Sequence, residues 1–258
     1  MINVIHEIIK YKGFLYELIL RDFKKKYYKS VLGVLWTLLY PLLFMVIKTI
    51  IFSTLFSRDI QNFPVYMLSG WLVFNFFSDA TNQGMYAIVS NGELIKKIYL
   101  PPYIFCMSTT TLALINSLIS MLSLFIIMAA TGTPFKLTLL LIPFLLIMVY
   151  FFALGISLVL SVMGAYFRDL FYLFGIALMA WFFLTPIFYP IEIVPETYRF
   201  FWDYNPLLHY VNIMRDLVLG GILPDSVTII YALFYSVLAM ILGIIMYSKL
   251  EKNLILHI

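Results

Sequence analysis

The stretch LTLLLIPFLLIMVYFFALGISLVLSVMGAYF, residues 137–167, contains no charged side chain. About 20 consecutive apolar residues are enough to cross the hydrocarbon core of a bilayer as a helix, so this stretch predicts a long membrane-spanning helix. The rest of the chain is similar: of 258 residues, 63% are hydrophobic and 12% are charged, whereas soluble domains carry about 25% charged residues. The composition therefore indicates an integral membrane protein, with too little sequence outside the apolar runs for a separate soluble domain.

Five further apolar runs are long enough to span a bilayer. They lie at residues 31–56, 63–89, 103–130, 170–189 and 227–248, and the second is the most polar of them. Together with residues 137–167 they predict an all-α membrane protein with six transmembrane helices. We expect residues 1–30 to form a separate N-terminal segment and residues 31–258 to form the six-span transmembrane domain.

The distribution of basic residues predicts the orientation. Six spans place both termini on one side, and 12 of the 17 Lys and Arg residues then fall on that side. Four fall on the opposite side and Lys48 falls within the first span. Because cytoplasmic loops carry an excess of Lys and Arg, we expect both termini in the cytoplasm.

The first 30 residues predict an amphipathic helix at the inner membrane interface. On a helical wheel its polar face contains Asn3, His6, Glu7, Lys10 and Glu17. A basic cluster follows, formed by Arg21, Lys24, Lys25, Lys26 and Lys29. Such a cluster anchors a chain to anionic headgroups, or it captures an anionic headgroup, such as a lipid-linked pyrophosphate, as substrate. The sequence leaves both interpretations open.

Sequence motifs for catalysis are missing. There is no P-loop, no G-x-S-x-G, no H-E-x-x-H and no C-x-x-C. The three histidines are far apart and the single cysteine, Cys106, excludes an internal disulfide. We therefore expect no catalytic residue, no metal site and no cofactor on this chain.

The segment TPIFYPIEIVPETYRFFWDYNPLLHYVNIMRDLVLGG, residues 185–221, is too polar to span and too apolar for an exposed loop. Asn205 and Pro206 predict the start of a helix, and Gly220–Gly221 predict its end. Pro195 precedes a shorter helix through Glu196–Tyr204. We expect two short external re-entrant helices within residues 190–225, which act either as a gate over an exit or as an interfacial cap. The predicted gate residues are Tyr198, Phe201, Trp202, His209, Asn212, Arg215 and Asp216.

Two further patterns suggest contact surfaces. The second span carries four polar residues on one helical face: Asn75, Asp79, Asn82 and Tyr86. Such a face either lines a translocation path or forms hydrogen bonds with a neighbouring helix. Aromatic residues make up 18% of the chain and either pack or line a channel whose ring faces stack on sugars. The candidate channel-lining residues are Trp36, Tyr40, Phe44, Asn75, Asp79, Asn82, Tyr86, Trp181 and Phe182.

Four blocks of the sequence are similar to one family. They are RDFKKKYYKSVLGVLWTLLYPLL (21–43), KKIYLPP (96–102), AYFRDL (165–170) and the segment 185–221. In this order they resemble the ABC-2 type polysaccharide export permeases, the Wzm-like family that exports O-antigen, capsule or teichoic acid chains.

The resemblance implies a homodimer that works with two copies of a separate ABC ATPase subunit, which binds ATP and Mg. It implies transport of a lipid-linked polysaccharide across the bacterial inner membrane. The chain is then expected to contact membrane lipids and to bind no nucleic acid. It also implies contact with the ATPase through the loops after the second and fourth spans. The corresponding residues are Glu93, Leu94, Ile95, Lys96, Lys97, Ile98, Tyr99, Arg168 and Asp169. The alternatives are an ABC-2 exporter of a drug or lipid and a membrane-embedded glycosyl or acyl transferase.

Overall fold

The protein is helical throughout the part of the chain that its structure, a computed structural model, describes. This part excludes residues 1, 57–59, 61, 98–99, 252–253 and 255–258, and it contains no β-strand. The elements are α1 (Ile2–Tyr27), α2 (Leu35–Phe56), α3 (Phe63–Ser90), α4 (Gly92–Lys97), α5 (Tyr103–Ala130), η1 (Leu137–Leu141), α6 (Ile142–Tyr166), α7 (Leu170–Leu184), η2 (Ile191–Ile193), α8 (Glu196–Asp203), α9 (Pro206–Arg215), η3 (Asp216–Gly220) and α10 (Ser226–Leu250). The prediction of an all-α chain is confirmed.

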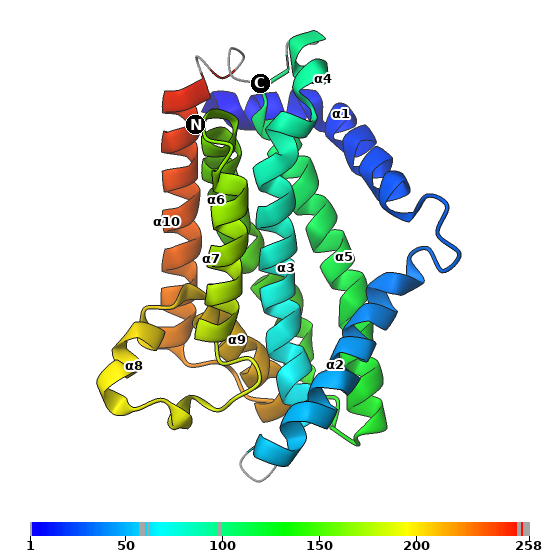
Figure 1. The fold of residues 1–258 in the computed structure, drawn as a ribbon, viewed down its shortest axis with the longest axis vertical. Coiled ribbons are helices and arrows are strands. Elements are labelled where there is room, and N and C mark those ends of the chain that lie inside the picture. Colours follow the sequence, from blue (N-terminus) through cyan, green and yellow to red (C-terminus); the bar gives the residue numbers. More distant parts are fainter. Residues whose placement is uncertain (1, 57–59, 61, 98–99, 252–253, 255–258) are drawn as a thin grey trace.

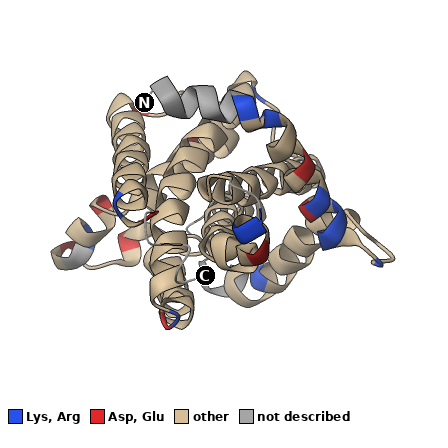
Figure 2. Cartoon of the chain, turned by 90° about the horizontal axis from the view of Figure 1, so that it is seen from above, with Lys and Arg blue, Asp and Glu red and all other residues tan. Residues whose placement is uncertain are grey.

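The long helices run between two ends of the molecule (Figure 1). Helices α1 and α4 lie at one end, together with the last turn of α10, and helices α8 and α9 lie at the other. Among the described residues, four segments are long and apolar enough to cross a membrane: α2, α5, η1 with α6, and α10. Most of each long helix is free of charged residues when the chain is seen from the α1 end (Figure 2). The chain is therefore a multi-pass membrane protein.

The remaining two predicted spans differ from these four. Helix α7 is apolar but has only 15 residues, because Pro186 follows closely and a proline disfavours helical backbone at the residue before it. Helix α3 has 28 residues and is more polar than α6, because its polar stripe interrupts the apolar residues. Both helices nevertheless run between the two ends of the molecule (Figure 1).

Helix α3 lies at the centre of the packing. It contacts α2, α5, α6, α7 and α9, and most of its side chains are buried. Gly84 permits the close approach of α6, because a Cβ at this position would overlap the side chain of Ser157. The Ser157 hydroxyl donates a hydrogen bond to the Ala80 carbonyl at 3.2 Å. Small residues and one interhelical hydrogen bond therefore hold α3 against α6.

Helices α6 and α10 form the most extensive contact between two elements. They cross at Gly155 and Gly243, and a Cβ at Gly155 would overlap the backbone carbonyl group of Ala239. A Cβ at Gly243 would lie 2.9 Å from the Gly155 Cα. The two backbones therefore touch, and neither can move aside as a flexible side chain would.

We expect Gly155→Ala to destabilise the protein by about 1–3 kcal/mol, because the added methyl group overpacks a backbone contact. The measurement is the temperature at which the detergent-purified protein loses its fold. Gly175→Ala is the matched control, because nothing lies within 4 Å of a Cβ at this α7 position, and alanine favours helix over glycine by about 1 kcal/mol. An equal melting temperature for the Gly155→Ala and wild-type proteins would contradict the close crossing.

Candidate functional site

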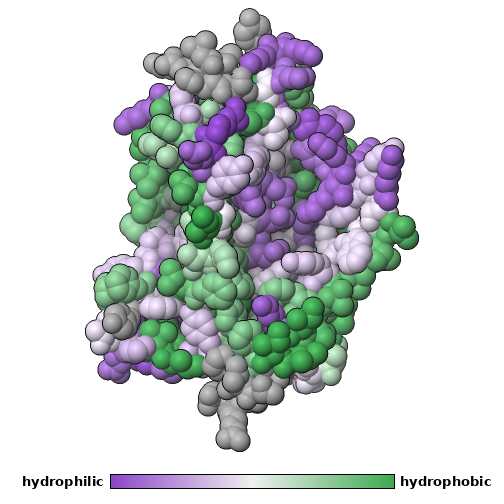
Figure 3. Space-filling model, viewed as in Figure 1, coloured by the Kyte–Doolittle hydropathy of each residue, from purple (hydrophilic) through white to green (hydrophobic). Residues whose placement is uncertain are grey.

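The polar stripe predicted on the second span lies on the open face of α3. Asn82 and Tyr86 are exposed, whereas Asn75 and Asp79 are half-buried. Helix α5 adds Asn116, Ser117 and Ser120, which surround a cavity of about 20 Å³ together with Asn75 and Asp79. A hydrophilic area continues from the α1–α4 end down between α3 and the arm formed by α1 and α2 (Figure 3). The stripe is therefore part of a wider polar face that faces away from the packed core.

The basic cluster at the end of α1 meets this polar face. The Lys26 Nζ lies 3.5 Å from the Asp79 Oδ2, and the Tyr27 hydroxyl donates to the Asn116 Oδ1 at 2.8 Å. Arg21 donates to the Asn91 Oδ1 at 3.0 Å. All five basic residues of the cluster are exposed. Arg21 and Lys26 also contact side chains of α3 and its cap, through Asn91 and Asp79.

The external segment forms the two short helices that the sequence predicts, α8 and α9. The Asn205 side chain caps α9 by accepting from the Leu207 N–H at 3.1 Å, and it also accepts from the Trp181 Nε1 at 2.8 Å. The Asn205 Nδ2 donates to the Leu184 carbonyl and the Thr185 Oγ1, both at 3.2 Å. One side chain therefore joins the start of α9 to the end of α7.

Helices α8 and α9 are attached very differently. Helix α9 is embedded, since Leu207, Tyr210 and Met214 have 0% of their surface exposed. On α8, Phe201 is 60% exposed, and a cavity of about 770 Å³, lined mostly by apolar and aromatic side chains, separates α8 from the end of α7. The side chain of Tyr198, a predicted gate residue, lies outside the described part of the structure, and Trp202 lines this cavity. Helix α8 therefore packs against the other helices less closely than α9 does.

Arg215 connects α9 to α3 and to the turn after α7. Its guanidinium carbon lies 3.6 Å from the centre of the Tyr66 ring, and its Nη2 donates to the carbonyls of Pro186 at 2.7 Å and Ile187 at 3.1 Å. Burial lowers the pKa of Arg215 to about 10, while Tyr66 and Glu192 oppose this shift. Arg215 therefore stays charged at neutral pH and acts as a clamp within the fold.

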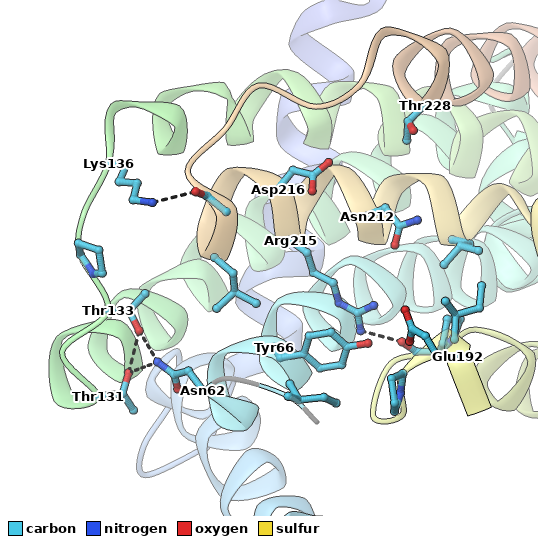
Figure 4. A pocket seen from close by; sticks show the side chains of 18 of the residues that line it. Asn62, Tyr66, Thr131, Thr133, Lys136, Glu192, Asn212, Arg215, Asp216 and Thr228 are labelled. Carbon is cyan, nitrogen blue, oxygen red and sulfur yellow. Dashed lines mark hydrogen bonds between the residues drawn. The ribbon is translucent and has the colours of Figure 1, made fainter. Parts of the chain in front are cut away.

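A large polar cavity opens beside this clamp, at the α8–α9 end (Figure 4). We call it the α9 pocket; its volume is about 1240 Å³. Its polar lining residues are Asn62, Tyr66, Thr131, Thr133, Lys136, Glu192, Asn212, Arg215, Asp216 and Thr228. They come from α3, the α5–η1 connection, η2, α9, η3 and α10. Three of the four polar residues predicted on the external helix meet here, whereas His209 points elsewhere and stacks on Tyr231 of α10.

The walls of the α9 pocket are held by hydrogen bonds. The Asn62 amide donates to the hydroxyls of Thr131, at 2.9 Å, and Thr133. The Lys136 Nζ donates to the Gly220 carbonyl at 2.8 Å. Burial raises the pKa of Asp216, and the nearby Asp225 raises it further. The pocket is therefore a formed cavity in which two carboxylates and two cations lie among hydroxyl and amide groups.

The sequence profile of the ABC-2 type transporter family matches residues 14–219. The chain belongs to this family. The resemblance seen in the sequence blocks is confirmed.

Curated ABC-2 type relatives match nearly the whole chain. The O-antigen export system permease protein RfbA of Klebsiella pneumoniae is 28% identical over 245 residues, which are 93% of this chain and 94% of the relative. RfbA of Myxococcus xanthus is 28% identical over 228 residues, 88% of each chain. The polysialic acid transport protein KpsM of Escherichia coli is 27% identical over 244 residues, 92% of this chain and 93% of the relative.

The docking residues expected of an ABC-2 permease lie at the α1–α4 end. Glu93, Lys96 and Lys97 are exposed on α4, and Leu94 is half-buried. Ile95, however, is only 4% exposed and packs in a cluster with Leu18 of α1 and Phe105 of α5. Ile95 thus packs within this chain, and docking of an ATPase through α4 stays a prediction. Ile98 and Tyr99 lie outside the described residues, and Arg168 and Asp169 are exposed between α6 and α7.

The candidate channel aromatics fall into two groups. Trp36 and Tyr40 of α2 are 46% and 57% exposed, and the half-buried Phe44 stacks on Trp71 of α3. Trp181 and Phe182 of α7 instead contact core residues, Phe77 and Phe74 respectively. The α2 aromatics are thus placed to line a surface, whereas Trp181 and Phe182 mainly pack. The channel itself stays a prediction.

Several residues of these sites were not singled out from the sequence. Tyr66, Lys136 and Glu192 line the α9 pocket, but they lie far apart along the chain and form no motif. The α5 residues Asn116 and Ser120 had a usable signal, because they are four positions apart and so share one face of a helix.

We expect Arg215→Ala to destabilise the α8–α9 end by about 2 kcal/mol, because it leaves two carbonyl groups without their donor. Arg215→Lys should restore little, since an ammonium group cannot both stack on Tyr66 and bridge two carbonyls. The measurement is limited proteolysis within residues 186–195, together with the melting temperature. Lys249→Ala is the control, since Lys249 is exposed on α10 at the opposite end of the molecule. Equal protection in the Arg215→Ala and Lys249→Ala variants would contradict the role of Arg215.

Proposed function

We propose that this chain is the permease subunit of an ATP-driven exporter that moves a lipid-linked polysaccharide across the bacterial inner membrane. The observation that carries the proposal is the similarity to O-antigen and polysialic acid transport proteins over more than nine-tenths of this chain. Because this similarity covers 93% of this chain and 94% of the relative, it is not confined to a few apolar helices.

The proposed topology has six spans: α2, α3, α5, α6 with η1, α7 and α10. Both termini lie in the cytoplasm, α1 lies along the inner interface, and α8 and α9 dip into the outer leaflet. The distribution of Lys and Arg supports this orientation. The alternating direction of these six helices between the two ends of the molecule supports the number of spans (Figure 1).

The proposed translocation path runs along the polar face of α3 and α5. This face is bordered by α2 and α7, whose apolar side chains are widely exposed in the single chain, for example Ile50 at 70% and Tyr172 at 79%. A second copy of the chain that covers these helices would enclose the polar face between two subunits. Polar side chains at membrane depth favour a water-filled path over contact with lipid, and exposed aromatics such as Tyr40 favour stacking on sugar rings.

The energy source is proposed to be two copies of an ABC ATPase subunit, since this chain has no P-loop of its own. ATP and Mg bind to that partner. Its closure would push on α4 and on the α6–α7 loop, and α4 follows directly after α3. A movement of the partner would therefore be transmitted through α4 and α3 to the polar face.

We expect the double substitution Lys96→Glu and Lys97→Glu to lower export at least about tenfold, because an interface weakened by about 1.4 kcal/mol loses that factor. The measurement is surface polysaccharide in cells that depend on this chain, with membrane insertion checked by immunoblot. Lys249→Glu is the matched control: it reverses an exposed charge at the same end, on α10. Wild-type export by the double variant would refute docking through α4.

A pull-down of the tagged chain in mild detergent tests the wider proposal. We expect a P-loop ATPase to be recovered in equal amount, with ATP turnover that lipid-linked glycans stimulate. Stimulation by lipids or drugs alone would favour a different ABC-2 cargo. A chain recovered alone from several detergents would refute the exporter.

A further inference from the structure

Two buried hydrogen-bond donors of α5 border the small cavity between α3 and α5. The cavity has a volume of about 20 Å³, and Asn116 and Ser117 form part of its α5 side. Asn116 is 5% exposed and Ser117 is 6% exposed. Within the described part of the chain, neither the Asn116 Nδ2 nor the Ser117 Oγ has a hydrogen-bond partner. Because a buried donor without a partner is costly, these two atoms indicate a ligand in the cavity.

The orientation of the Asn116 amide is fixed by α1. The Tyr27 hydroxyl donates to the Asn116 Oδ1 at 2.8 Å, which leaves the Nδ2 as the group without a partner. The α3 side of the cavity contains Asn75 and Asp79, whose side-chain oxygens accept hydrogen bonds. Donors of α5 and acceptors of α3 therefore border the same cavity.

Size and chemistry identify the ligand as a single water molecule. A cavity holds one water when its volume reaches about 10–15 Å³ and about two to four polar groups border it, and both conditions are met here. A cation such as calcium or magnesium needs several oxygen ligands. Asn116, however, has its oxygen bound to Tyr27, and Asp79 lies 3.5 Å from the Lys26 ammonium. A water molecule can accept from the Asn116 Nδ2 and donate to the Asp79 carboxylate.

The cavity lies at a junction of α1, α2, α3 and α5. The Lys26 ammonium of α1 pairs with Asp79 of α3. The Tyr27 hydroxyl of α1 donates to Asn116 of α5, and a serine hydroxyl of α5 donates to the Thr37 carbonyl of α2 at 2.9 Å. The junction therefore attaches the arm formed by α1 and α2, with its basic cluster, to the polar face.

We propose that a bound water molecule completes this junction by bridging Asn116 and Ser117 of α5 to Asp79 of α3. Asn116 and Ser117 are then positioning residues: they hold the Asp79 carboxylate through the water, and Asn116 holds the end of α1 through Tyr27. In the proposed function, this sets the position of the basic cluster beside the translocation path. The water site itself does not rest on that function.

Two serine substitutions on α5 test the water. Ser108 is the matched control, because its buried hydroxyl also lacks a partner within the described residues but does not line this cavity. We expect Ser108→Ala to keep or raise the melting temperature of the full chain in lipid nanodiscs, since it removes an unpaired group. Ser117→Ala should lower it by about 2–4 °C, the shift expected for the loss of one hydrogen bond. The same shift in both variants would overturn the inference.

Filling the cavity distinguishes a bound water from a dry void. Ser117→Val places a methyl group where the water would lie, so we expect a melting temperature below that of Ser117→Ala, because the Asn116 Nδ2 then loses its partner. A melting temperature above that of the wild-type protein would show a dry void and overturn the inference. A wild-type melting temperature that falls when sodium is replaced by choline would assign the cavity to a cation, and it would overturn the inference as well.

The position of the arm is the second readout. Spin labels at Lys25→Cys on α1 and Leu118→Cys on α5 report the distance between these helices, since both positions are exposed and the native Cys106 is buried. We expect one narrow distance distribution, which Ser117→Val broadens and Ser108→Ala leaves narrow. An unchanged distribution in the Ser117→Val protein would overturn the positioning role. These measurements involve neither an ATPase nor a cargo, so their failure would leave the proposed function in place.

Discussion

The packing of α3 between α5 and α6 is the constraint on which the other elements depend. In an apolar environment every backbone N–H and C=O must be satisfied within its own helix, so helices associate through side-chain packing and a few interhelical hydrogen bonds. Helix α3 meets this requirement with Gly84 against Ser157 on the α6 side. Its polar residues are left to one open face, and the elements that bear on function gather along that face or at the ends of α3.

The two ends of α3 carry the two segments with the clearest functional chemistry. At one end Tyr66 lies beneath the Arg215 guanidinium and borders the α9 pocket. At the other end Asn91 receives a hydrogen bond from Arg21 of α1, directly before α4. A helix transmits displacement along its axis because its hydrogen bonds are continuous. One rigid element therefore joins the proposed ATPase contact to the proposed exit.

Charge in this protein is placed where its desolvation is offset. Arg215 is compensated by two carbonyls and an aromatic face, and Lys26 by Asp79. The exposed Lys24 and Lys25 have water and lipid headgroups as their natural partners. Glu192 and Asp216 line the α9 pocket together with Lys136 and Arg215. The α9 pocket is therefore polar, whereas the cavity beneath α8 is lined mostly by apolar side chains.

The sequence by itself determined the helical membrane fold, the helix caps at Asn205–Pro206 and the turn at Gly221, because periodicity, length and local backbone preferences act over a few residues. It also predicted the stripe from Asn75 to Tyr86, which needs only one helix. Only the tertiary structure decided that Ile95 is buried, that Trp181 hydrogen-bonds Asn205, and that Tyr66, Lys136 and Glu192 share one cavity. These facts depend on how helices distant in sequence pack against one another, and no spacing along the chain encodes that packing.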